Sequence, residues 1–157
     1  MRTEARPLTD AGLLILRVSV GLIFLTHGWP KLMNGASETA EFFGQLGIPA
    51  PGVSAWFITL LEFAGGLALV LGAFVSILSV LFILHMTAGI FLVHLANGWY
   101  VIGPGQGGSE FNVLLIASLL LFILAGSGRP AVDDVISARR AGAGAPSAGT
   151  ETGSGGV

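Results

Sequence analysis

The feature that most constrains the fold is a long apolar stretch in the middle of the chain. Residues 54–95 are almost entirely apolar over about forty positions. As a single helix this stretch would be about 60 Å long, twice the roughly 30 Å thickness of the hydrocarbon core of a bilayer. It must therefore fold back on itself. The sequence LGAFVS around Gly72 is the expected hinge, which predicts two membrane-spanning helices at residues 55–71 and 75–96.

Two further apolar segments lie on either side of this stretch. Residues 10–29 are apolar except for Arg17, and residues 111–125 form a shorter segment that Glu110 and Gly126 extend. The sequence therefore predicts an all-α membrane protein that folds as a four-transmembrane-helix bundle.

These spans also predict the domain organisation. The transmembrane domain is expected at residues 11–128, between an N-terminal tail at 1–10 and a C-terminal tail at 129–157. After Arg140 the sequence consists mainly of Gly, Ala and Ser, which have little apolar surface to bury. We therefore expect the C-terminal tail to be largely disordered.

The composition supports a membrane location and excludes several kinds of function. The 157 residues are 53% hydrophobic and 10% charged, with a mean hydropathy of +0.83, whereas about a quarter of the residues in soluble domains are charged. A net charge of −2 provides no basic surface for nucleic acid. The absence of cysteine excludes thiolate metal sites and disulfide exchange. Any redox chemistry must use a bound organic cofactor or a partner.

The placement of basic residues predicts the orientation in the membrane. The two ends of the chain carry Arg2, Arg6, Arg129, Arg139 and Arg140. In the two opposite loops, the only basic residue is Lys31. Both termini are therefore expected to be cytoplasmic, which requires an even number of spans. The first apolar run contains Arg17 and is followed by HGWPKL rather than small residues, so we expect it to remain as an anchor.

The first outer loop contains the pattern of a short amphipathic helix. Ser37 is a candidate N-cap, Phe42, Phe43 and Leu46 form an apolar side, and Gly47 is a stop signal. We expect an interfacial helix that lies on the membrane. The alternative is an ordinary loop.

Three ionisable residues are expected at one depth within the membrane. Counting the helical rise from the inner end of each span places Arg17, Glu62 and His85 in the same layer. An ion pair between Arg17 and Glu62 would neutralise both charges, and His85 could bond the same carboxylate. One interpretation is a buried ion pair that locks helix packing. The other is a proton-handling or ligand-binding site, in which Glu62 accepts a proton and His85 relays it; the candidate catalytic residues are then Glu62, His85 and Arg17.

A second polar layer is expected near the outer surface. Its candidate ligand-binding residues are His27, Lys31, His94 and Glu110. His85 and His94 are nine residues apart, about 180° around a helix, so only one of them should face a given cleft. The alternatives are histidines merely tolerated at the interface, a b-type haem held by His27 and His94, or a metal held by these two with Glu110. Because neither cofactor site has a diagnostic spacing, no metal site is predicted.

Four motifs occur in a fixed order along the chain. They are RVSVGLIFLTHGWPKL in the first span, LEFAGGLALVLG in the second, GGSEFNVLLIASLLL entering the fourth, and GSGRPAVDD after it. Together they resemble the DoxX family of small four-helix bacterial membrane proteins, and the match covers residues 13–134. In this resemblance, the recurring polar positions of the family are Arg17, His27, Gly28, Lys31, Glu62, Gly66, Glu110 and Asp133.

The resemblance implies a multi-pass protein of the bacterial cytoplasmic (inner) membrane that is linked to redox metabolism. Relatives in the family include a subunit of a thiosulfate to quinone oxidoreductase, proteins associated with quinone and catechol stress, and a membrane anchor for oxidative-stress enzymes. The expected partners are membrane lipid and a soluble or membrane redox protein, and a homo-oligomer is left open by the sequence.

The leading hypothesis is a quinone-like molecule bound between the helices, with proton or electron transfer to a partner. Glu62 and His85 would handle protons, Arg17 would set the charge of Glu62, and His27 with Lys31 would donate hydrogen bonds to a ring oxygen. The alternative is a non-catalytic scaffold that recruits redox enzymes through the cytoplasmic ends. The sequence does not decide between an enzyme and a scaffold. Transport is disfavoured, because no internal repeat with paired broken helices is present.

Overall fold

The computed structural model describes residues 5–103 and 106–143, and these residues form helices joined by short connections, with no strand among them. The elements are α1 (Ala5–Asn34), α2 (Ser37–Gln45), α3 (Pro51–Leu60), the π-helical turn η1 (Leu61–Gly65), α4 (Gly66–Leu71), α5 (Val75–Gly89), the π-helical turn η2 (Ile90–His94), the 3₁₀ turn η3 (Leu95–Asn97), α6 (Glu110–Ala125) and α7 (Val132–Ala143). The all-α prediction is confirmed.

Three helical segments are long and apolar enough to cross a membrane. They are Pro7–Asn34, Pro51–Leu71 and Val75–Asn97. The fourth apolar helix, Glu110–Ala125, has 16 residues, fewer than the roughly 20 that a perpendicular crossing needs. The four-span count and the orientation of the termini therefore stay predictions.

The predicted hinge around Gly72 is confirmed. Gly72 is the C-cap of α4 and has a φ of 74°, and Phe74 is the N-cap of α5 and has a φ of 53°. Both residues adopt the left-handed conformation, which reverses the chain within a few residues. The carboxylate of Asp133 accepts hydrogen bonds from the backbone N–H groups of Phe74 (2.8 Å) and Val75 (3.0 Å). Asp133 therefore caps α5 from a distant part of the chain.

The structure describes a helix at the start of the predicted C-terminal tail. Residues 129–143 lie in the segment expected to be a largely disordered tail, yet they contain α7 and the Asp133 cap. The composition of this segment does not reveal the order, because the bonds that hold it come from α1 and from the turn between α4 and α5. The part of this prediction that concerns residues 144–157 lies outside the described residues.

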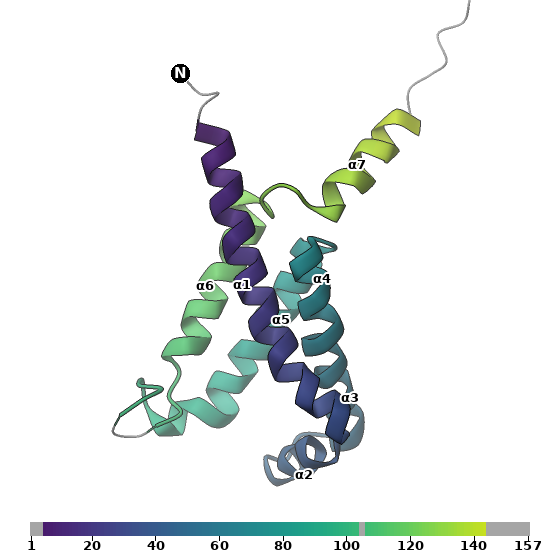
Figure 1. Cartoon of the computed structure of the whole chain (residues 1–157). Helices are drawn as coiled ribbons and strands as arrows, with labels where there is room; N and C mark the ends of the chain where they lie inside the picture. Colours follow the sequence, from purple (N-terminus) through teal and green to yellow (C-terminus); the bar gives the residue numbers. More distant parts are fainter. Residues whose placement is uncertain (1–4, 104–105, 144–157) are drawn as a thin grey trace, which may run out of the picture.

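The helices form two pairs. α1 packs along α3, η1 and α4, and α5 packs along α6. Figure 1 shows the two pairs crossing in the middle of the molecule and diverging towards the end that carries α2, whereas the start of α1 and α7 lie at the opposite end. The rings of Phe24 on α1 and Phe82 on α5 stack with centroids 3.7 Å apart, and both side chains are buried. This stack joins the two pairs.

Glycine allows α1 to contact its neighbour backbone to backbone. A Cβ atom on Gly28 would lie 2.5 Å from the backbone nitrogen of Phe63, and one on Gly66 would lie 2.6 Å from that of Leu25. Small residues commonly permit such close approach between membrane helices. These glycines therefore fix the distance between α1 and the η1–α4 segment.

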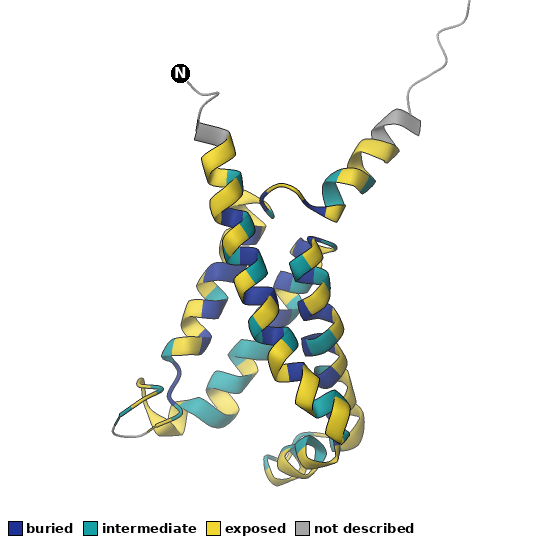
Figure 2. Ribbon diagram, viewed as in Figure 1, coloured by how far each residue is buried: buried dark blue, intermediate teal, exposed yellow. Residues whose placement is uncertain are grey.

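The surface of the bundle is strongly apolar. Figure 2 shows exposed residues along the outward faces of the helices and buried residues where the helices cross. The most exposed apolar side chains within the spans include Ile15, Ile77, Leu84, Phe91 and Leu124. Such a surface would promote aggregation in water. In a protein with membrane-spanning helices, it is the surface that contacts lipid.

The short helix predicted in the first outer loop is confirmed as α2. Its capping differs from the prediction, because Ser37 is the first helical residue and Ala36 is the N-cap, with no side-chain capping bond. Phe42 and Phe43 lie on the side of α2 that faces the bundle. The ordinary-loop alternative is therefore wrong, and an interfacial position of α2 stays a prediction.

Candidate ligand-binding site

A large cavity lies between the two helix pairs at the end that carries α2. Its volume is about 1180 Å³, slightly above the usual range of roughly 300–1,000 Å³ for small-molecule sites. Aromatic and aliphatic side chains from α2, α3 and η2 form most of its walls; examples are Phe42, Phe43, Val53, Phe57 and Leu92. The cavity therefore suits a largely apolar molecule.

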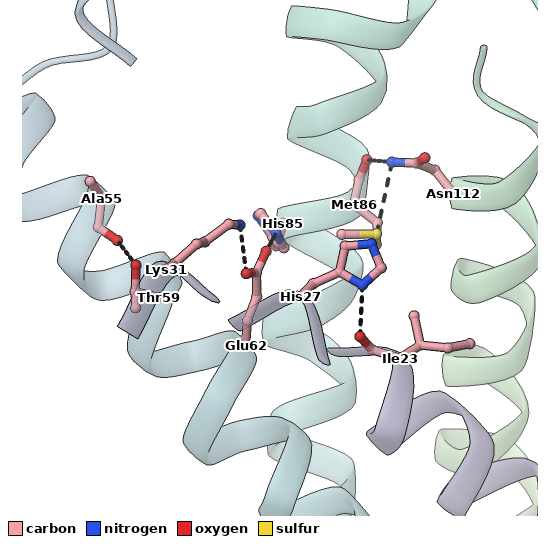
Figure 3. A network of polar contacts seen from close by, with 9 residues as sticks. All are labelled: Ile23, His27, Lys31, Ala55, Thr59, Glu62, His85, Met86 and Asn112. Atoms are coloured by element: carbon pink, nitrogen blue, oxygen red, sulfur yellow. Dashed lines mark hydrogen bonds and ion pairs between the residues drawn. The ribbon is translucent and has the colours of Figure 1, made fainter. Parts of the chain in front are cut away.

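The polar part of the cavity is a cluster of Lys31, Glu62 and His85. Lys31 Nζ lies 2.6 Å from Glu62 Oε2, and His85 Nε2 lies 3.1 Å from Glu62 Oε1. Figure 3 shows the three side chains converging from three different helical segments. The side chain of Glu62 is 6% exposed, that of His85 18% and that of Lys31 29%. The carboxylate is thus enclosed, while the Lys31 side chain is partly exposed and lines the cavity.

Local backbone structure places these groups together. Glu62 lies in η1, and π-helical turns widen a helix locally and occur often at functional sites. α1 continues through Pro30 to Asn34, so Lys31 lies on a helix. Side chains on a helix point back towards its N-terminus. The ammonium group of Lys31 therefore extends into the bundle, towards Glu62.

The charges of the cluster are balanced within the chain. Both oxygens of Glu62 have a hydrogen-bond partner, and the positive charge of Lys31 compensates its negative charge. An ammonium group has three donors, and among the described residues Glu62 is the only acceptor that bonds Lys31. Lys31 consequently has donors available for an oxygen atom of a ligand in the cavity.

Residues 12–95 match the DoxX family, a segment that covers more than half of the chain and includes Lys31, Glu62 and His85. The chain belongs to the DoxX family. Its membership confirms the resemblance seen in the four sequence motifs.

Three curated relatives of this DoxX protein come from Bacillus subtilis and Escherichia coli. "Putative oxidoreductase CatD" of Bacillus subtilis is 34% identical over 127 residues, which are 81% of this chain and 88% of the relative. "Inner membrane protein YphA" of Escherichia coli is 32% identical and covers 82% of this chain and 91% of its own length. "Inner membrane protein YqjF" of the same organism is 29% identical and covers 84% and 97%. No solved structure matches the chain. The family and these relatives identify a multi-pass protein of the bacterial inner membrane.

The predicted ion pair between Arg17 and Glu62 is wrong. In this DoxX protein, Arg17 Nη1 donates to the backbone oxygens of Ser127 (2.9 Å) and Gly128 (3.0 Å), and Nη2 donates to that of Pro130 (2.9 Å). Arg17 is 1% exposed. Counting depth from Cα positions failed because the side chain points towards the N-terminus of α1, away from Glu62. Arg17 therefore binds the connection between α6 and α7, and Lys31 takes the expected place beside the carboxylate.

The predicted contact between His85 and Glu62 is confirmed. The expectation that only one of His85 and His94 faces a given cleft is wrong. Both histidines line the cavity, as does His27. His94 lies at the end of η2, whose π-helical geometry changes the angular spacing on which that expectation depended. The sequence shows no clear signal for this turn.

The ring nitrogens of two histidines have defined partners. The Nδ1 atoms of His27 and His94 lie 2.8 and 2.6 Å from the backbone oxygens of Ile23 and Gly107. A carbonyl oxygen accepts, so each Nδ1 carries the proton. In the neutral ring, Nε2 is then an acceptor. His27, which was expected to donate to a ligand, therefore presents an acceptor when neutral.

Glu110 is not brought together with the other predicted binding residues. It does not line the cavity, and its Oε1 accepts a hydrogen bond from the backbone N–H of Val101 at 2.9 Å. Glu110 thus holds the connection that precedes α6. In the described part of the chain, no three His, Asp or Glu side chains are grouped to hold a metal ion, which removes the basis for a metal held by His27, His94 and Glu110.

Sequence reasoning missed two residues of the site. Asn112 on α6 and Met86 on α5 both line the cavity, and Asn112 Nδ2 lies 3.4 Å from the backbone oxygen of Met86. Asn112 is 7% exposed. A single amide within an otherwise apolar helix is a usable signal, because a buried amide needs hydrogen-bond partners. Met86 gives no signal, since methionine is common in apolar helices.

Proposed function

We propose that this protein binds a quinone-like molecule in the cavity and that the cluster of Lys31, Glu62 and His85 exchanges protons with it, in support of redox chemistry with a partner. The observation that carries the proposal is a balanced, hydrogen-bonded cluster of ionisable groups at the polar end of an apolar cavity. Ionisable groups within membrane proteins commonly mark functional sites.

The chemistry of a quinone fits the groups of the cavity. An apolar ring suits the aromatic and aliphatic walls, and its oxygens need polar partners. The free donors of Lys31 suit a ring carbonyl, and Nε2 of a neutral His27 suits the hydroxyl of the reduced ring. Glu62 accepts a proton and His85 relays it. When bound, the quinone supplies the electron chemistry, and the chain supplies position and proton exchange. The name of the Bacillus relative, "Putative oxidoreductase CatD", agrees with this class.

Glu62→Gln should weaken the binding of a quinone. The substitution keeps the shape of the side chain but removes the charge that holds the ammonium group of Lys31. Lys31 is then no longer held in place to donate to the ring carbonyl. Because a charged hydrogen bond is lost between Lys31 and the ring, we expect the affinity for a decyl-substituted para-benzoquinone to fall by at least about tenfold. Equilibrium binding to the purified protein in lipid nanodiscs measures this effect.

A matched control is Glu41→Gln. Glu41 is an exposed carboxylate on α2 that does not line the cavity. The control should bind the quinone as the wild type does, and all three proteins should insert into membranes equally. Equal affinity of the wild type and Glu62→Gln would contradict the proposed role of the cluster.

A second candidate function is a scaffold that recruits soluble redox enzymes. It is favoured by α7, which projects from the end of the bundle opposite to α2 and carries exposed Val135 and Arg139. Under this function, deletion of residues 132–157 would abolish recovery of soluble redox enzymes with the protein from native membranes. The quinone affinities of the wild type and Glu62→Gln would then be equally weak.

A further inference from the structure

The amide of Asn112 faces the cavity and is weakly held by the protein. Its Nδ2 lies 3.4 Å from the backbone oxygen of Met86 and 3.8 Å from the sulfur of the same residue. Typical N–H···O bonds are 2.7–3.2 Å long, and thioether sulfur is a weak acceptor. Among the described residues, none donates a hydrogen bond to the side-chain oxygen of Asn112. The amide therefore has both a donor and an acceptor for a ligand.

Asn112 and the charged cluster line different parts of the same cavity. Figure 3 shows its amide on the α6 side of Met86, while Lys31, Glu62 and His85 converge on the other side. A Cβ atom on Gly89 would lie 3.4 Å from Nδ2 of Asn112, so Gly89 forms a flat wall beside the amide. Gly89 follows His85 by one helical turn, about 6 Å along α5. Asn112 and Lys31 both line the same cavity.

We propose that Asn112 is a specificity-determining residue that hydrogen-bonds the second oxygen of a ring whose first oxygen binds Lys31. The inference rests on the proposed function and names its ligand class: rings with two oxygens on opposite carbons, in preference to rings with one. An amide suits both redox forms of such a ring. Its N–H group donates to a carbonyl of the oxidised form, and its oxygen accepts from a hydroxyl of the reduced form.

Two ligands and two variants test this preference. The ligands are a decyl-substituted para-benzoquinone and a decyl-substituted cyclohexenone, which has the same chain but one ring oxygen. A neutral hydrogen bond changes affinity by about two- to tenfold. We expect the wild type to bind the quinone more tightly than the enone by this factor and Asn112→Leu to bind both equally. The control is Asn97→Leu, because Asn97 is exposed and does not line the cavity. It should keep the wild-type preference.

The outcomes separate this inference from the proposed function. If the wild type binds neither ligand, both are overturned. If it binds the quinone and Asn112→Leu keeps the full preference, only the role of Asn112 is overturned.

Infrared spectra of the wild type provide a test that does not depend on the folding of a variant. The quinone is labelled with ¹³C at one carbonyl or the other. Hydrogen bonding to both Lys31 and Asn112 should lower both carbonyl stretching frequencies relative to the quinone in lipid. A shift of one carbonyl alone would overturn the inference.

Discussion

Arg17 and Lys31 show how the direction of a side chain decides the role of a charge within a bundle. Both are basic residues on α1, and both side chains point towards its N-terminus. For Arg17 this direction leads to three backbone oxygens at the end of the bundle, which its planar guanidinium group can bond at the same time. For Lys31 it leads to Glu62 and the cavity. The first charge is structural, and the second belongs to the candidate site.

Arg17→Met should release the connection between α6 and α7. Loss of three hydrogen bonds frees this connection, and with it Asp133, which caps the N-terminus of α5. At about 0.5–1.5 kcal/mol for each bond, the backbone amides of Phe74 and Val75 should exchange hydrogen at least about tenfold faster. Hydrogen-exchange mass spectrometry of peptides that cover the hinge measures this rate.

Arg139→Met is the matched control for this substitution. Arg139 is exposed on α7, so its replacement should leave exchange at the hinge unchanged. Unchanged exchange in Arg17→Met as well would show that Asp133 caps α5 without help from Arg17.

At the residue scale, the sequence identified most of the candidate site but not its correct pairing. Glu62 and His85 stand out because ionisable groups within apolar helices need partners. The partner of Glu62 was assigned incorrectly because sequence counting locates Cα atoms, whereas Arg17 and Lys31 carry their charges at the ends of long side chains. Asn112 was missed because only ionisable groups were compared by depth.

At the scale of helices, glycines determine how closely α1 approaches η1 and α4. The backbone nitrogens of Leu25 and Phe63 lie directly against Gly66 and Gly28. This contact also fixes the distance between Lys31 and Glu62, because those residues lie on the same two segments.

Gly66→Ala should force these segments apart and destabilise the protein. A Cβ atom would lie 2.6 Å from a backbone nitrogen, which has no flexible side chain that can move away. Overpacking of this kind typically costs about 1–3 kcal/mol in the free energy of unfolding. Unfolding by titration with SDS measures the change.

Gly12→Ala provides the same chemical change without the clash. Gly12 lies in α1, and among the described residues no atom beyond its own helix backbone lies within 4 Å of an added Cβ. The higher helix propensity of alanine should therefore stabilise the helix by up to about 1 kcal/mol. A loss of stability in Gly12→Ala equal to that in Gly66→Ala would contradict the role of close packing.

The helices themselves were largely predictable from the sequence, whereas their irregular parts were not. The hinge at Gly72 follows from the length of the apolar stretch and from the glycine. The π-helical turns η1 and η2 have no such signal in the sequence. α7 was missed because its ordering bonds come from Arg17 and the hinge rather than from its own composition.

At the scale of the whole molecule, the cavity occupies one end and a packed core closes the other. The Phe24–Phe82 stack and the buried side chains of Leu69, Leu119 and Phe122 lie in this core. Entry of a ligand from the α2 end therefore leads to the charged cluster but not through the bundle.

Single cysteines can test this closure, because the chain contains none of its own. Ser54 lines the cavity, and Ser79 on α5 is 0% exposed. In nanodiscs, a sulfonated maleimide should label Ser54→Cys and leave Ser79→Cys unlabelled until SDS is added. The decyl benzoquinone should slow labelling of Ser54→Cys. Labelling of both sites at similar rates would show that the bundle is open at both ends.

The placement of α7 has a consequence for any soluble enzyme that docks there. Arg17, which holds the connection to α7, and Lys31 are separated by about 21 Å along α1. Under the proposed function, a docked enzyme would therefore have no direct route to a quinone at Lys31, because the packed core stands between them. Electrons would then pass by release of the reduced quinone into the bilayer and its capture elsewhere, so the rate would depend on the abundance of that carrier in the lipid.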